Sequence, residues 1–178
     1  PAPITPAPIT PAPVAMVDDL AFYQVLPNPM NGVADFDGEY IALINPTDSN
    51  VDLDAFDYQL CREDGFRCTA LTGKVLAPGD VFVACKNAAF YDFCDVEANF
   101  FMRDDDPDTL ELWKDMAEFD STELGISTVA SGNAGLCWQL DGSGGYAFDS
   151  CVPLEEDAEI SILEALPNPP GGVADSDG

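Results

Sequence analysis

The chain has 178 residues and a formal net charge of −27, because it holds 33 Asp and Glu residues, 6 Lys and Arg residues and no His. This charge excludes nucleic acid as a partner, since phosphates would be repelled where they need cations. It also disfavours anionic membrane surfaces and favours attraction of cations, Ca²⁺ above all. No apolar run approaches the ~20 residues of a membrane span, so we expect no membrane-spanning segment.

The absence of His also bears on catalysis. Without His the chain has no Ser-His or Cys-His pair that would activate a nucleophile. Paired carboxylates can hydrolyse glycosides, but among 33 acidic residues such pairs arise by chance. We therefore expect a protein that is not an enzyme and that needs no cofactor, with Ca²⁺ as the one ion it could bind.

The chain begins with a five-residue repeat, Pro-Ala-Pro-Ile-Thr, which occurs twice and starts a third time at Pro11. Proline fixes φ and removes backbone donors, so residues 1–16 are expected to form an extended polyproline II linker. Thr5 and Thr10 stand beside prolines, as in mucin-like stalks that carry O-linked sugar. A linker without sugar is the alternative.

The first strand is predicted at residues 20–26. Strict alternation places Leu20, Phe22 and Gln24 on one face and Val25 on the other. Pro27 then ends the strand, because it has no backbone N–H to continue a ladder.

Further short apolar runs follow, separated by polar turns. Alternation buries Tyr58 and Leu60 together with Phe56, and it turns Leu110 and Leu112 inward. A glycine-rich turn joins the last two runs in a hairpin. The absence of a long helical period, with strands at this close spacing, predicts an all-β sandwich or barrel. These strands are predicted at residues 39–45, 51–53, 56–61, 66–70, 81–85, 109–114, 136–140 and 146–148.

Six cysteines in a β-rich chain of this size predict three disulfides and an oxidising compartment. A zinc site is disfavoured, because there is no Cys-x-x-Cys pair and no His. Six cysteines allow 15 pairings. We expect neighbours in sequence to pair, because each neighbouring pair brackets a turn. The cysteines are Cys61, Cys68, Cys85, Cys94, Cys137 and Cys151.

Part of the first strand region recurs near the end of the chain. Residues 26–38 (LPNPMNGVADFDG) and residues 166–178 (LPNPPGGVADSDG) agree at ten of thirteen positions. Ile160 and Ile162 fall on the positions of Leu20 and Phe22. We therefore expect one module over residues 17–153, followed over residues 154–178 by a linker and the first strand of another repeat.

The alternative is that this extra strand is donated to a neighbouring subunit. Head-to-tail donation that does not close into a ring gives a filament, and a chain of linked modules is also elongated. In both cases we expect contacts between modules at the duplicated strands and at the loops around Asn28 and Asn168. The predicted assembly residues are Leu20, Phe22, Asn28, Ile160, Ile162 and Asn168.

Four motifs in the first half of the module point to a known family. They are Leu-Pro-Asn-Pro at 26–29, Asp-Gly-Glu-Tyr-Ile-x-Leu-x-Asn at 37–45, Val-Asp-Leu at 51–53 with Phe56 shortly after, and Leu-x-Pro-Gly at 76–79. In these motifs the chain resembles the lamin tail domain, over roughly residues 19–152. The resemblance implies an immunoglobulin-like β-sandwich that serves in interaction and assembly rather than in catalysis.

The lamin tail family includes nuclear lamins and also many secreted and cell-surface proteins, in which the domain is often repeated. This chain has no coiled-coil heptads, carries six cysteines and is strongly acidic, so it fits the secreted branch better. At the position of Ala42 the family often has Glu, and we expect an exposed side chain there.

Two acidic loops are candidates for Ca²⁺ binding. The first holds Asp35 and Asp37 just before a glycine. The second holds four carboxylates in five positions, at Asp104, Asp105, Asp106 and Asp108. The alternatives are a hairpin loop whose Asp side chains bond their own backbone for the first, and a solvated loop for the second.

We therefore expect a structural repeat unit of an extracellular filament or surface fibre, which associates with copies of the same module. The alternative is a secreted Ca²⁺-dependent adhesion module that binds a glycan or a protein. Trp113 and Trp138 are the candidates for stacking on a sugar, and packing in the core is the other role open to them.

Overall fold

The structure is a computed structural model that describes residues 19–30, 37–63, 65–99, 102, 108–124, 133–140 and 145–154. The predicted N-terminal linker with Thr5 and Thr10 lies outside these residues. So does most of the segment 154–178, including Ile160, Ile162 and Asn168.

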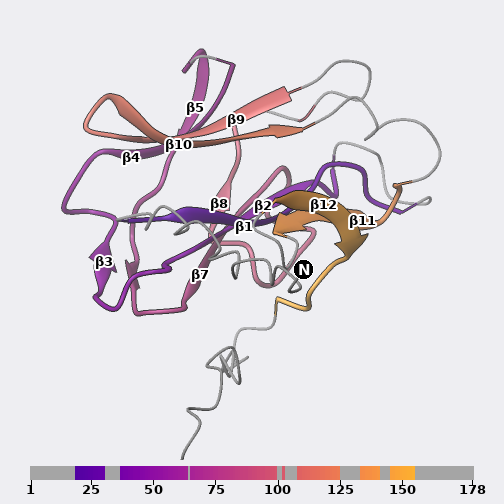
Figure 1. Ribbon diagram of the computed structural model, residues 1–178, viewed down its shortest axis with the longest axis horizontal. Coiled ribbons are helices and arrows are strands. Elements are labelled where there is room, and N and C mark those ends of the chain that lie inside the picture. The colour runs from indigo at the N-terminus through magenta and orange to yellow at the C-terminus, as the bar shows by residue number, and fades with distance from the viewer. Residues whose placement is uncertain are drawn as a thin grey trace, which may run out of the picture.

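The described chain is all-β and forms a sandwich of two main sheets (Figure 1). All strand pairs are antiparallel except β7 with β8. The larger sheet has the order β12 (Tyr146–Ser150), β11 (Leu136–Leu140), β1 (Ala21–Leu26), β2 (Tyr40–Ile44), β7 (Val81–Cys85), β8 (Val96–Glu97). The smaller has the order β10 (Ala117–Leu124), β9 (Asp108–Lys114), β4 (Tyr58–Arg62), β5 (Arg67–Ala70), and β3 (Val51–Asp52) pairs with β6 (Val75–Leu76). In the described residues no helix is long and apolar enough to cross a membrane.

The main hydrophobic core lies between the two sheets. Leu110 and Leu112 of β9 are fully buried there, as the alternation of β9 predicts. Tyr58 and Leu60 of β4 join them. Phe56, which the sequence places on the same face, is instead in the turn before β4 and is exposed. That prediction is wrong because β4 begins only at Tyr58.

A second hydrophobic cluster covers the outer face of the six-stranded sheet. Ala42 and Val83 lie in it, beneath the partly buried rings of Tyr91 and Phe93. Tyr91 and Phe93 are stacked, with ring centroids 4.7 Å apart, and both meet Tyr40 edge-on. Ala42 is 0 % exposed, so the expectation of an exposed side chain there is wrong. A Glu in its place would put a charge into an apolar layer.

Strand β1 contributes to both clusters, and a β-bulge determines which of its residues face each one. Its register with β2 shifts between Phe22 and Gln24, so that Tyr23 is an extra residue. Phe22 and Val25 therefore both face the main core, while Leu26 faces the outer cluster. The predicted faces of Gln24 and Val25 are wrong, because strict alternation does not hold across a bulge.

Gln24 is fully buried, and its amide is satisfied on both sides. Its Oε1 accepts from the backbone N–H of Val152 at 2.9 Å, and its Nε2 donates to the carbonyl of Val152 at 2.9 Å and to the Tyr40 hydroxyl at 3.0 Å. Tyr40 in turn donates to Sγ of Cys137 at 3.2 Å, since a disulfide sulfur has no proton. Burial is the main cause that raises the pKa of Tyr40, and the nearby Tyr91 and Tyr23 raise it further. Gln24 thus holds the segment after β12 against β1.

All three disulfides join neighbours in sequence, which is the pairing expected from the turns. They are Cys61–Cys68, Cys85–Cys94 and Cys137–Cys151. The first links β4 to β5, and the other two border the outer cluster. Leu154, assigned by sequence to the linker, packs on this cluster as well, so the module extends at least one residue further than predicted.

The eight-residue strand β10 is absent from the sequence prediction. It pairs with β9 through a turn at Asp115 and Met116, where both residues have positive φ, 51° and 65°. This is the backbone of a type I′ hairpin turn, which sequences usually mark with Asn-Gly or Asp-Gly. Here Met116 takes the second position, so the usual signal is missing.

We predict that Gln24→Ala lowers the free energy of unfolding by about 1–3 kcal/mol, because it removes the hydrogen bonds of a fully buried amide to the peptide groups of Val152 and to the Tyr40 hydroxyl. Gln139→Ala is the matched control, since Gln139 lies opposite Gln24 on β11 but makes only an exposed bond to Ser150. The control should change stability by no more than about 0.5 kcal/mol. Equal losses in urea unfolding would contradict the role given to Gln24.

We predict that Met116→Gly stabilises the module. The Met116 side chain is 83 % exposed, so little packing is lost. The penalty of about 1–2 kcal/mol for a left-handed L-residue is removed, against about 0.5–1 kcal/mol of added backbone entropy in the unfolded chain. The expected gain is about 0.5–1 kcal/mol in thermal or urea unfolding. Ala117→Gly, one residue later in a strand, should instead destabilise.

Candidate functional site

The described part of the predicted Ca²⁺ loops holds only Asp37 and Asp108, since Asp35, Asp104, Asp105 and Asp106 lie outside it. Asp108 is the first residue of β9 and is 1 % exposed. Its Oδ1 lies 3.3 Å from Nε of Arg62 on the neighbouring strand. Asp108 therefore does not belong to a solvated acidic loop, and its nearest cation is an arginine. No group of three acidic, Cys or His side chains in the described residues could hold a metal.

Two of the predicted assembly residues are core residues. Leu20 and Phe22 are both 0 % exposed and lie in the cluster between the sheets. The prediction that these two side chains themselves touch another module is therefore wrong, because the module buries them internally. Asn28 is half-buried, and its carbonyl accepts from the N–H of Gly135 at 2.8 Å. It connects the end of β1 to the turn before β11.

The two tryptophans have different surroundings. Nε1 of Trp113 donates to Oε2 of the buried Glu111 at 2.7 Å, and the same oxygen accepts from the N–H of Gly65. Trp113 thus helps to hold the β4–β5 turn. Trp138 donates from Nε1 to Oγ1 of Thr122 in β10 at 3.1 Å and packs at the margin of the main core. Both are half-buried.

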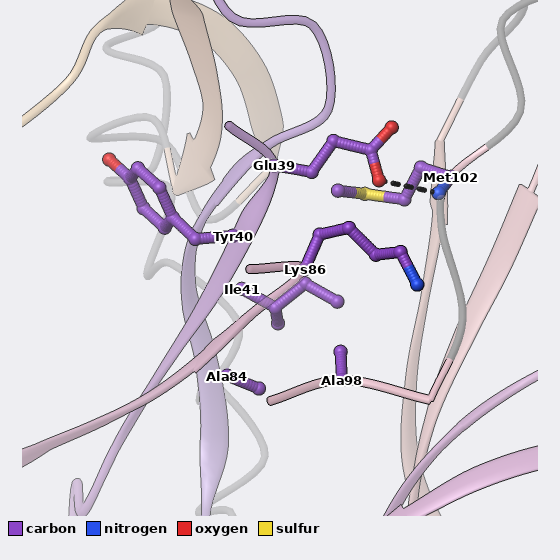
Figure 2. Close-up of a pocket in the computed structure, with 7 residues that line it drawn as sticks. All are labelled: Glu39, Tyr40, Ile41, Ala84, Lys86, Ala98 and Met102. Carbon is purple, nitrogen blue, oxygen red and sulfur yellow. Dashed lines mark hydrogen bonds between the residues drawn. The ribbon is translucent and has the colours of Figure 1, made fainter. Parts of the chain in front are cut away.

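A small pocket lies beside β2 and β7 (Figure 2). The carboxylate of Glu39 points toward Met102 and accepts from its backbone N–H at 2.9 Å. Lys86 contributes the other charged side chain. This arrangement holds the segment around Met102 against the sheet. The lining residues are Glu39, Tyr40, Ile41, Ala84, Lys86, Ala98 and Met102.

The two sheets are offset from each other. β10 lies over β1, because Asp120 accepts a hydrogen bond from the backbone N–H of Phe22. β5 lies over the end of β8, because the N–H of Asn99 donates to Oγ1 of Thr69 at 2.7 Å. The larger sheet continues past β1 to β11 and β12. In the described residues this hairpin therefore extends beyond the last strand of the smaller sheet (Figure 1).

The inner face of the extending hairpin is apolar. Trp138 lies opposite Phe148, and Leu140 lies opposite Tyr146, so the four share one face. Trp138 stacks on Tyr146 with centroids 6.0 Å apart and meets Phe148 at 5.0 Å. Leu140 is 50 % exposed. We call this face, made of Trp138, Leu140, Tyr146 and Phe148, the aromatic overhang.

Where β11 diverges from β1, side chains form hydrogen bonds with the backbone groups of β1. β1 pairs with β11 only at Gln24 and Val25. At Phe22 the N–H donates to Asp120, and the carbonyl accepts from the Tyr146 hydroxyl at 3.2 Å. Burial, and secondly the charge of Asp120, raises the pKa of Tyr146 to about 12. Burial is also the main reason that the pKa of Asp120 is raised.

A scan against protein-family models and a search of curated proteins found no match for this chain. The sequence predicts the β11–β12 hairpin, but it does not predict the offset of the sheets. That offset depends on β10 and on Asp120, neither of which carries a local signal.

We predict that Asp120→Asn stabilises the module at neutral pH. A raised carboxyl pKa means that the native state holds a proton more tightly than the unfolded state, in which the pKa is near the ordinary value of 3.8. Stability contributed by this group therefore falls as pH rises through the native pKa. The Asn variant should have a higher free energy of unfolding than wild type at pH 7. This difference should vanish below the pKa that Asp120 has in the unfolded state.

Glu97→Gln on the short strand β8 removes the same charge and serves as the control in urea titrations at several pH values. Asp120 also accepts a hydrogen bond from the backbone N–H of Ser121 at 2.9 Å. A variant Asp120→Asn that is less stable than wild type at pH 7 would show that the hydrogen bonds Asp120 accepts from Phe22 and Ser121 outweigh the cost of burying its charge.

Proposed function

We propose that this chain is a structural repeat unit of an extracellular filament or surface fibre, built on an immunoglobulin-like sandwich of the lamin tail type. The observation that carries the proposal is the position of β1. β1 is a central strand that pairs with both β2 and β11. Its sequence region is the one that recurs over residues 160–178.

Residues 160–166 repeat the sequence pattern of a central strand, so they are expected to require neighbouring strands to pair with. Leu20 and Phe22 are fully buried, and Ile160 and Ile162 hold the equivalent positions. A strand left alone would expose two apolar side chains and a row of unpaired backbone groups. Its sheet can belong to a following module or to a neighbouring subunit. Both arrangements link modules into an elongated assembly.

The three disulfides support an extracellular location. Such bonds form and persist in oxidising compartments and are rare in the cytosol. The four motifs that resemble the lamin tail domain support a module of that family of interaction domains. They fall on the end of β1 and the turn after it, on β2, on β3, and on the end of β6 with the turn after it. The net charge of −27 supports a protein that stays soluble while its strands associate selectively.

We predict that Ile160→Ser with Ile162→Ser abolishes regular assembly and leaves the described module folded. The measurement is electron microscopy of the full chain, with thermal unfolding to monitor the module. Ile4→Ser with Ile9→Ser is the matched control, because it makes the same chemical change in the Pro-Ala-Pro-Ile-Thr repeats. The wild type and the control should form filaments or strings of beads.

Single particles of the wild type at low and high Ca²⁺ would overturn the proposal. Binding of a glycan or protein that depends on Ca²⁺, without any assembly, would instead favour the adhesion module.

A further inference from the structure

The aromatic overhang is a strand-wide apolar surface with no strand of the opposite sheet above it in the described chain. β10 is the last strand of that sheet and lies over β1. Trp138 and Tyr146 cover part of the overhang by packing toward the main core, while Leu140 stays half exposed. A two-layer sandwich normally covers such a face with another strand.

The edge of β10 beside the overhang is open. β10 pairs with β9 on one side, and no other described strand pairs with it. Thr122 and Trp138 are hydrogen bonded, so the edge and the aromatic face adjoin each other. Open edges are where extended segments add by main-chain hydrogen bonds, with side-chain pockets giving specificity.

We propose that residues 160–166 of a second copy of this chain add to the edge of β10, with Ile160 and Ile162 packed on the aromatic overhang. This inference rests on the proposed function and specifies the contact that builds the assembly. The added strand becomes a fifth strand of the smaller sheet. It brings that sheet out over β11, which pairs the edge of β10 and covers the exposed apolar face.

The segment 160–166 suits this position because it resembles β1. In the module itself, Phe22 of β1 already lies beside the overhang, with its carbonyl bonded to the Tyr146 hydroxyl. Phe22, Trp138 and Tyr146 belong to one cluster. Ile160 and Ile162 are two residues apart, so in a strand they point to the same side. A strand of this pattern buries two large apolar side chains, each stabilising by about 1.5–3 kcal/mol.

A second copy must supply the strand, because the chain's own segment starts on the wrong side. Val152 is bonded to Gln24 of β1, and Leu154 packs on the outer face of the larger sheet. From there a path around β12 crosses about three strand spacings, ~14 Å, and then ~10 Å to the opposite layer. The six steps from Leu154 to Ile160 span at most ~22 Å when fully extended, which is shorter than this path of ~24 Å. The segment of the same copy therefore does not reach.

Both partners in this contact are acidic, so the contact depends on ionic strength. The sequence of β10, AEFDSTEL, holds three acidic residues, and the donated strand follows Glu155, Glu156, Asp157 and Glu159. The two partners repel each other until salt screens them. Assembly should therefore strengthen as ionic strength rises. A basic partner on the same surface would give the opposite salt dependence.

The test places a photo-cross-linking amino acid at position 162 of the full chain and mixes copies of two isotopic masses. Irradiation of the assembled material should link position 162 of one copy to residues 117–124 or 136–150 of another. Links within one copy, or links between copies at β2, would overturn the proposal, the latter because it indicates exchange of β1. Assembly without any link to these regions would also overturn it.

A pair of variants tests the receiving surface. Leu140→Lys places a charge on the overhang, and Val75→Lys places the same charge on another exposed apolar residue, 54 % exposed. Leu140→Lys should reduce the assembled fraction about tenfold at fixed protein concentration, with the thermal midpoint of the module unchanged. Val75→Lys should assemble like wild type. Equal effects of the two variants would overturn the proposal, whereas a wild-type chain that never assembles would instead remove the proposed function itself.

Discussion

The fold depends on one constraint, which is that β1 must be covered on both of its faces. One face meets the opposite sheet, and the other meets the outer layer that contains Tyr91, Phe93 and two of the disulfides. A strand of strict alternation would turn Val25 outward and the Gln24 amide into the main core. The bulge at Tyr23 shifts the alternation by one residue. Val25 then packs in the main core, and the Gln24 side chain forms hydrogen bonds with the peptide groups of Val152.

Much of the fold is readable from the sequence because most strands are short, apolar and bounded by turn residues. The alternation of Leu110 and Leu112, the hairpin across residues 141–145 and the pairing of neighbouring cysteines all follow local rules. β10 does not follow them, because Asp115 and Met116 form its turn without a glycine. Gln24 is misplaced because the bulge at Tyr23 has no local signal in the sequence, and Ala42 is misplaced for another reason. A local pattern does not reveal that loops cover the outer face of a sheet.

The candidate site is harder to predict than the fold for the same reason. Trp138 and Tyr146 are visible in the sequence as strand aromatics, but whether they lie in a core or at its margin depends on how far the opposite sheet extends. That extent is set by the contacts of Asp120 with Phe22 and of Thr69 with Asn99, which join residues far apart in the chain. The duplicated strand is visible at once, whereas the surface that could receive it requires the tertiary structure.

The disulfide pattern has a consequence for how a long chain of such units could be made. The three bonds close loops with sequence separations of only 7, 9 and 14 residues. Each cysteine therefore meets its partner soon after both leave the ribosome, before the next unit has been synthesised. If units of this kind follow one another in a chain, each would then complete its own bonds, and thiols of different units would have little opportunity to pair wrongly. In the proposed fibre, adding units would then not enlarge the number of possible cross-links in each one.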